Sequence, residues 1–407
     1  MKAGLEDYSE KFVEESLGLA KGVVESGSLP SELVQAVGAA VAGREDARAE
    51  NPVLDSMLLR SLEDIEKRSF EVRGFSVRKA RWPGGASFAA CLTHDVDNVD
   101  RPWSHIRERR DRFSAWDYWT ARLGLKSLYN NISYASGMEA KRGVRSSFYL
   151  LSSNYDLTRM ASELRTLESD GWDVGLHGDT GTHDSEDRMK EAVTKFRERT
   201  GIEPKGLREH YLRFDYGATW SIAQTAGFEY DTTVGNTDRL GFRLGLCTPF
   251  HPPDEEWRPR PLLEIPLALM DTTLWGYLKK TEEEGRRDFR AMTRSVKEVN
   301  GLFTLLWHTE SMRMKGGRIY PALLDELRAT DCYIANGRSV AGWWNARAAP
   351  LLLDDDGFRM PDSPAGLCLD FKAKDGRRVV AEGGTVEKRG DTTVVRATSG
   401  HVGVRLE

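Results

Sequence analysis

A repeated strand-then-helix order between about residues 86 and 348 is the feature that most limits the fold of this 407-residue chain. Short apolar runs alternate there with amphipathic stretches, and a glycine, which ends helices by adopting the left-handed conformation, closely follows four of those stretches: Gly171, Gly201, Gly227 and Gly301. The expected strands are 87–92, 146–151, 173–176, 205–207, 230–234, 262–269, 302–306 and 333–335. Seven or eight such units predict an α/β fold with a parallel sheet, most economically a closed or nearly closed (β/α) barrel.

The segments on either side of this region have different patterns. Residues 1 to about 66 carry apolar residues at helical spacing, and the alternation of apolar residues from about Phe70 to Trp82 predicts a short β segment. From Leu351 onward, alternating segments are separated by Gly and Asp, which is typical of β-strands joined by turns. We therefore expect a helical N-terminal region with a short β segment at 1–82, the barrel at 83–349 and a small β domain at 350–407.

Composition argues against two classes of partner. The 58 Lys and Arg residues are outnumbered by 63 Asp and Glu, and no long basic run occurs, so the overall charge pattern is not that of a protein that binds nucleic acid or an anionic membrane. No stretch of about 18 apolar residues is present, and the acidic N-terminus does not resemble a signal peptide. We therefore expect no membrane span and a cytoplasmic location. The four cysteines are far apart, without a C-x-x-C pair, which indicates reduced thiols.

Polar residues gather just beyond the expected strands, where a parallel barrel builds its active site. Asp95 and Asp97 are two positions apart, so in an extended strand their side chains leave the same face and can share one site. Paired carboxylates need a cation or a shared proton to relieve their repulsion. The alternative for Asp97 is a cap on the following segment. The other residues at these strand ends are His177, His183, Arg208, His210, Tyr211 and His308, and Asp231 opens the fifth expected strand.

A metal ion fits this set of side chains. His177 and His183 flank a five-residue polar loop, and imidazoles combined with a carboxylate form the usual ligand set of a catalytic zinc-type ion. Each histidine also has a simpler interpretation as a hydrogen-bonded structural residue. The sequence pattern alone leaves both interpretations open.

These motifs resemble those of the NodB-type polysaccharide deacetylase family, a carbohydrate esterase group with a distorted (β/α) barrel fold. The segment from Thr93 to Asp97 resembles the family's first motif, Thr-aromatic-Asp-Asp, with one residue inserted between the acids. The resemblance implies that Asp95 is the general base and Asp97 a metal ligand. The family's second motif has two metal-binding histidines separated by three residues. His177 matches the first and His183 stands two positions beyond the second, with His210 as the alternative third ligand.

Two further motifs imply roles in proton transfer and charge stabilisation. The segment Arg208-Glu209-His210-Tyr211 resembles the family's Arg-x-Pro-Tyr motif, which implies that Arg208 orients the base and that the backbone N–H of Tyr211 binds the oxyanion. The segment Leu306-Trp307-His308 matches Leu-x-His and implies that His308 is the general acid that protonates the leaving amine. Asp231 is the candidate for the acid that supports His308.

The resemblance covers about residues 86–348 and implies a hydrolase that removes an N-acetyl or related N-acyl group from an amino sugar. The implied cofactor is a divalent metal ion, zinc first, with cobalt, manganese, nickel and iron as alternatives. Two other functions stay open: a metal-dependent amidohydrolase acting on an imide, ureide or formamide, and a catalytically inactive sugar-binding module of the same fold.

Substrate contacts are expected from aromatic and basic residues outside the motifs. The candidates are Trp103 in the aromatic-rich segment 100–143, Arg243 in the segment 242–254, and Trp307 beside the implied general acid. Trp116 and Trp119 are three positions apart, a spacing typical of a helix face, which we expect to pack against the barrel.

Overall fold

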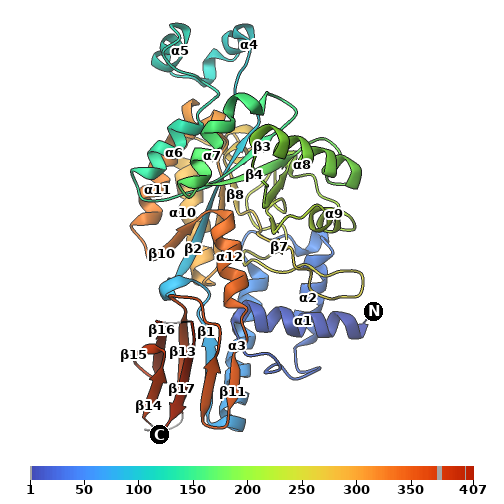
Figure 1. Cartoon of the computed structure of the whole chain (residues 1–407), viewed down its shortest axis with the longest axis vertical. Helices are drawn as coiled ribbons and strands as arrows, with labels where there is room; N and C mark the ends of the chain where they lie inside the picture. Colours follow the sequence, from blue (N-terminus) through green and yellow to red (C-terminus); the bar gives the residue numbers. More distant parts are fainter. Residues whose placement is uncertain (1, 374–377, 399) are drawn as a thin grey trace.

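The computed structural model describes residues 2–373, 378–398 and 400–407. Figure 1 shows an elongated molecule, with the C-terminal β-strands at one end of the long axis, the barrel in the middle, and helices α4 and α5 standing clear of the barrel at the other end. Within the described residues, no helix is both long and apolar enough to cross a bilayer.

The central region is a nine-stranded sheet in which every neighbouring pair is parallel. Its order is β7-β6-β5-β4-β3-β2-β9-β8, with β10 beside the first part of β2. The strands are β2 (Phe88–Val96), β3 (Ser147–Leu151), β4 (Asp173–Gly178), β5 (Gly206–Glu209), β6 (Tyr230–Asp231), β7 (Leu263–Glu264), β8 (Leu269–Met270), β9 (Leu302–Leu306) and β10 (Cys332–Ala335).

The two ends of this sheet meet. Strands β7 and β8 are parts of one short stretch of chain, in which the N–H of Leu267 donates to the carbonyl of Val234 and the N–H of Ala268 to that of Thr304. The sheet therefore curls into an almost complete ring, and the expected distorted (β/α) barrel is confirmed. All parallel strands point their carboxyl ends to the same side, which is the side where the site lies.

Helices cover the outside of the barrel, and local capping signals fix their ends. Ser185 caps α8, whose last turn is closed by Gly201 at φ 74°, and Thr281 forms a capping box with Glu284 at the start of α10. The expected helices that precede the four glycines are thus present. The bounds are α7 (Ala161–Ser169), α8 (Glu186–Thr200), α9 (Thr219–Thr225), α10 (Glu282–Glu298), α11 (Tyr320–Arg328) and α12 (Gly337–Arg347).

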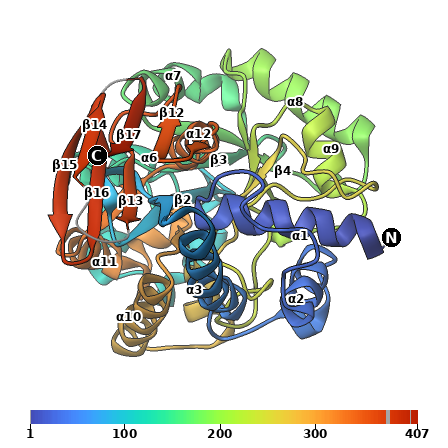
Figure 2. The ribbon, with the colours of Figure 1, turned by 90° about the horizontal axis from the view of Figure 1, so that it is seen from below.

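Helices α1 (Lys2–Leu17), α2 (Ser31–Val41) and α3 (Val53–Arg73) form the N-terminal region and pack against one another beside the barrel (Figure 2). The prediction of β structure at Phe70 and Val72 was wrong, because both lie in α3. The helix buries Leu58, Leu62 and other residues at helical spacing, and it continues to Gly74, which ends it in the left-handed conformation at φ 74°.

The predicted β segment begins one residue later, as β1 (Phe75–Lys79), and its partner is a C-terminal strand. Two four-stranded antiparallel sheets, β1-β13-β16-β15 and β11-β12-β17-β14, pack together with Phe358 against Phe371 at 5.7 Å between ring centroids. The strands are β11 (Leu352–Asp354), β12 (Gly357–Met360), β13 (Cys368–Ala373), β14 (Val379–Glu382), β15 (Gly384–Arg389), β16 (Thr392–Ala397) and β17 (Val402–Leu406). The N-terminal segment thus completes the C-terminal β-sandwich.

The long connection between β2 and β3 forms an insertion with helices α4 (Trp103–Glu108), α5 (Ala115–Arg122) and α6 (Ile132–Ala140). A small core of its own holds the insertion together, made by Ile106, Phe113, Tyr118, Leu128 and Tyr129. The expectation that Trp116 and Trp119 pack against the barrel was wrong, since they are 74% and 55% exposed. Helix α5 stands away from the barrel (Figure 1). It buries Tyr118 in the small core of the insertion and leaves both tryptophans exposed.

Candidate active site

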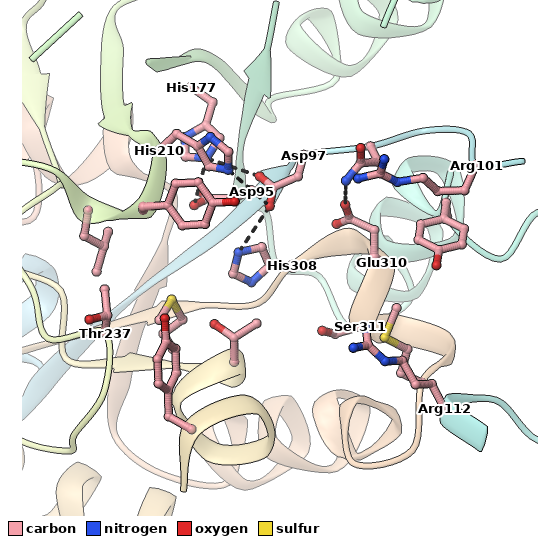
Figure 3. Close-up of a pocket in the computed structure, with 18 of the residues that line it drawn as sticks. Asp95, Asp97, Arg101, Arg112, His177, His210, Thr237, His308, Glu310 and Ser311 are labelled. Carbon is pink, nitrogen blue, oxygen red and sulfur yellow. Dashed lines mark hydrogen bonds and ion pairs between the residues drawn. The ribbon is translucent and has the colours of Figure 1, made fainter. Parts of the chain in front are cut away.

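A cavity of about 390 Å³ opens at the carboxyl ends of the barrel strands, a size typical of small-molecule sites. Asp95 comes from the end of β2 and Asp97 follows it, while His177 comes from β4. His210 follows β5 and His308 follows β9. Figure 3 shows the Asp97 carboxylate facing the imidazoles of His177 and His210 on one side and His308 on another.

Asp97, His177 and His210 are placed to hold a metal ion. One ligand atom from each lies within 4.8 Å of the other two. The Nε2 atoms of His177 and His210 are 3.2 Å and 3.8 Å from the carboxylate oxygens of Asp97. His177 Nδ1 is 2.7 Å from the carbonyl oxygen of Arg208, and because a carbonyl only accepts, Nδ1 carries a proton, which leaves Nε2 as the atom that would bind a metal ion in the neutral imidazole.

The charges around these residues also fit a cation. Buried Oδ1 atoms of Asp95 and Asp97 receive no hydrogen bond from the described part of the chain. Burial raises the pKa of Asp97, but the imidazoles of His177 and His210 and the charge of His308 outweigh burial and hold that pKa well below its usual range. The carboxylate therefore stays ionised, and a divalent cation satisfies both the unpaired oxygens and the lone pair of His177.

His183, the expected third ligand, lies outside this group. Its Nε2 contacts Asp184 at 3.6 Å, and its backbone carbonyl accepts a hydrogen bond from the hydroxyl of Thr219 on α9 at 2.8 Å. That bond anchors the loop to α9. The alternative named from the sequence, His210, occupies the third position.

Arg208 lies beside the implied general base. Its side chain is fully buried, with Nη2 donating to the hydroxyls of Thr93 at 2.9 Å and Thr232 at 3.2 Å, and its Nε lies 3.7 Å from Oδ1 of Asp95. The two threonines fix the guanidinium in front of Asp95. This geometry fits the orienting role implied for Arg208.

The acid that supports His308 is Asp271, a residue the sequence reasoning missed. Asp271 Oδ1 lies 2.6 Å from His308 Nδ1, and its Oδ2 accepts the backbone N–H of His308 at 3.2 Å. Burial lowers the pKa of His308, but the carboxylate of Asp271 outweighs burial and raises that pKa well above its usual range. Asp271 stands two residues past the expected strand 262–269, so the rule that active-site residues follow strands could have found it.

The earlier assignment of this role to Asp231 was wrong. Asp231 is fully buried and accepts a hydrogen bond from the hydroxyl of Thr233 at 2.6 Å. Burial raises the pKa of Asp231 and also that of Glu264, its carboxyl neighbour. Two such carboxyls stay close by sharing a proton, so this pair is a structural contact inside the barrel.

Tyr211 lies in a strained turn directly after His210. Tyr211 and Leu212 both adopt the left-handed conformation, at φ 60° and 52°, which is costly for residues with side chains. The exposed ring of Tyr211 stacks on His210 with 4.0 Å between centroids. Binding of an oxyanion by the backbone N–H of Tyr211 stays a prediction.

The pocket wall opposite the histidines comes from the β2–β3 insertion and the segment after His308. It includes Arg101, Arg112 and Tyr129 from the insertion, and Glu310, whose carboxylate accepts a hydrogen bond from the Asn98 side chain at 3.2 Å (Figure 3). Burial, with the nearby charge of Asp97, raises the pKa of Glu310 to about 8. The sequence reasoning named none of these residues as site residues.

The three residues expected to bind substrate lie outside the pocket lining. Trp307 is fully buried and its indole N–H donates to the carbonyl of Gly317 at 3.1 Å. Trp103 packs on Tyr118 inside the insertion, and Arg243 lies over the ring of Tyr216. Each of these side chains therefore makes a structural contact with a neighbouring segment of the chain.

Comparisons with known proteins agree with this fold. No protein-family profile and no curated protein matches the chain by sequence. Among solved structures, a Mycobacterium smegmatis protein assigned as a polysaccharide deacetylase is similar over 67% of this chain and 96% of its own, at 18% identity and a TM-score of 0.50. A Pseudomonas aeruginosa PAO1 protein with the same assignment matches over 67% and 95% of the two chains, at 16% identity and a TM-score of 0.48. The allantoinase Puue matches over 66% and 93%, at 15% identity and a TM-score of 0.45.

The likeness to the Mycobacterium smegmatis protein shows a shared fold. The central region thus has the NodB-like barrel of the polysaccharide deacetylases, as the sequence motifs led us to expect. At this level of identity the likeness carries the fold alone. What the chain does has to be argued from its own residues.

Proposed function

We propose that this chain is a metal-dependent hydrolase that removes an N-acetyl or related N-acyl group from an amino sugar. The observation that carries the proposal is the presence of three functional groups in one pocket. A ligand set (Asp97, His177, His210) lies beside an oriented base (Asp95, held by Arg208) and a charged acid (His308, held by Asp271). A module that only binds sugar needs neither the base nor the acid.

The side chains support hydrolysis of an amide in the following order. Asp95 accepts a proton from a water molecule while the oxygen of that water attacks the carbonyl carbon of the amide. The product of this step is a tetrahedral oxyanion. The C–N bond then breaks as His308 delivers its Nε2 proton to the amine nitrogen, because an amide anion is a very poor leaving group. Asp271 keeps His308 protonated for this step. A divalent cation, with zinc as the expected ion, supplies a Lewis acid that polarises the carbonyl and acidifies water.

The test combines metal analysis with product detection. Purified protein is incubated with zinc, cobalt or manganese, its bound metal is measured, and acetate release is followed on a panel of N-acetylated amino sugars. Cyclic ureides and formamides are included as a second substrate class. Asp95→Asn and His308→Gln are the inactive variants, and His183→Gln is the matched control because His183 lies outside the ligand group.

The expected result is about one metal ion per chain and acetate release that both inactive variants lose by roughly 100-fold or more. Protein that binds no metal and releases no acetate after metal addition would overturn the proposal. Hydrolysis of a ureide or formamide without acetate release would instead assign the site to the non-sugar substrates.

A further inference from the structure

The outer face of helix α5 is apolar and exposed. Trp116, Trp119 and Leu123 follow the spacing i, i+3 and i+7, which puts them on one face of the helix, and Leu125 follows close by. Leu123 and Leu125 are each 72% exposed, about as much as Trp116. Four large apolar side chains thus gather at the tip of the insertion. We call this surface the α5 tip.

Helix α5 differs from an ordinary amphipathic helix, whose outer side is polar. The inner side of α5 already supplies Tyr118 to the insertion's small core, so the helix is apolar on both sides. Asp117, the helix's own acid, is paired with Lys126 at 2.8 Å and lies 3.6 Å from Arg313. Exposed apolar side chains grouped in this way are typical of a surface that binds a membrane or another apolar surface.

The insertion that carries this tip has an excess of positive charge. Residues 101–131 contain seven Lys and Arg against three Asp and Glu, although the whole chain has a net charge of −5. In the part of the chain that the structure describes, four of these arginines, Arg107, Arg109, Arg110 and Arg122, have no carboxylate within 4.0 Å. Two of them lie over aromatic rings, Arg110 over Tyr118 and Arg122 over Trp103, both at 5.1 Å. The insertion therefore combines exposed apolar side chains with an excess of positive charge.

The position of the tip suits contact with a flat surface. Helices α4 and α5 form one end of the molecule's long axis, opposite the β-sandwich, so no other element reaches past them (Figure 1). The same insertion contributes Arg101, His105, Arg112 and Tyr129 to the wall of the catalytic pocket. The insertion therefore connects the α5 tip, and any surface bound to it, with the catalytic pocket.

We propose that the α5 tip docks onto the surface of a lipid bilayer that contains anionic lipids. Tryptophan favours the headgroup level of a bilayer, leucine favours the acyl boundary just below it, and arginine pairs with lipid phosphates. The occupant is lipid rather than a single-stranded nucleic acid because Leu123 and Leu125 offer no ring on which a base can stack. A second copy would bring two positively charged tips together, at an electrostatic cost. The inference does not depend on the chemistry of the pocket.

Vesicle co-sedimentation and tryptophan fluorescence test the proposal on the full chain. We expect binding to phosphatidylcholine vesicles that contain phosphatidylglycerol, weaker binding to pure phosphatidylcholine, a loss of binding as salt rises, and a blue shift of the emission. The double variant Trp116→Ser/Trp119→Ser should lose roughly tenfold or more in partitioning. Arg109→Gln/Arg110→Gln should weaken binding and reduce its salt dependence. The matched control is Val72→Ser, which changes a 76% exposed apolar residue on α3.

Four outcomes would overturn the proposal. The first two are that the protein does not bind anionic vesicles, and that the Trp116→Ser/Trp119→Ser variant binds them as tightly as the wild type. The third is that the wild type self-associates without binding vesicles and this variant abolishes the self-association. The fourth is that the protein binds an oligonucleotide and not vesicles. All substituted side chains are exposed, and circular dichroism confirms that the variants fold. Hydrolysis of a soluble amino sugar is measured separately and should be unchanged in the variant, so docking and the proposed activity succeed or fail independently.

Discussion

Asp271→Asn tests the proton donor most directly. The substitution keeps the shape of the side chain and removes the charge that lies 2.6 Å from His308 Nδ1. With that charge gone, burial lowers the pKa of His308 against the weaker opposing charges of Asp97 and Asp95 alone, so the imidazolium form is lost at a lower pH than in the wild type. Only the protonated form can donate to the leaving amine. Activity should therefore fall as pH rises through the pKa of His308, and the fall should come earlier in the variant.

The size of the effect follows from the role of the proton. A positioned general acid contributes roughly 10²–10⁴-fold to rate, and above the pKa each unit by which that pKa falls costs about a further tenfold, or 1.36 kcal/mol. The deficit in kcat should be largest at alkaline pH and shrink toward acidic pH. KM and metal content should change little, because Asp271 is outside the ligand group.

The assay is a pH profile of kcat and KM from about pH 5 to 9, in a range where metal stays bound. Asp231→Asn is the control, because Asp231 is a buried carboxyl near the site that makes no contact with His308. A deficit of equal size at every pH would mean that Asp271 only supports the fold. A shifted profile in Asp231→Asn with a normal profile in Asp271→Asn would refute the assignment.

Three further predictions concern the metal and the fold. His210→Ala should lose bound metal while His183→Ala keeps it, as measured by elemental analysis; the reverse would require a different ligand set. Chelation should abolish activity and lower the melting temperature, and added metal should restore both, since an ion that binds only the folded state stabilises it. Phe75→Ala should destabilise the protein by about 3–5 kcal/mol in urea unfolding, because the buried ring packs 5.5 Å from Phe371; a loss below about 1 kcal/mol would contradict the packing described for β1.

Local signals explain why much of the barrel could be predicted from the sequence. Strand runs, helix periodicity and glycine caps act within a few residues, and the structure follows them closely. The same is true of Asp95 and Asp97, whose shared site follows from their spacing at the end of β2. Asp271 carries an equally local signal, since it follows the expected strand 262–269, whereas Asp231 opens the preceding strand.

Other features depend on long-range contacts that no local pattern contains. The position of His183 is set by a hydrogen bond from Thr219, 36 residues away, which draws its loop toward α9. The exposure of Trp116 and Trp119 depends on the position of α5 relative to the barrel. Helical spacing predicts that the two side chains share a helix face, but it does not predict what that face packs against. The partner of β1 likewise lies at the far end of the chain.

That partnership has a consequence for how the chain folds during synthesis. Val77 on β1 pairs with Phe371 on β13, 294 residues later. At about 5–20 residues per second, β1 leaves the ribosome roughly 15–60 s before the strand that completes its sheet. During that interval the barrel region can fold, while β1 keeps an open edge that attracts other strands. A later part of the chain therefore protects an earlier one, and ribosomes stalled before β13 should release chains that aggregate through β1.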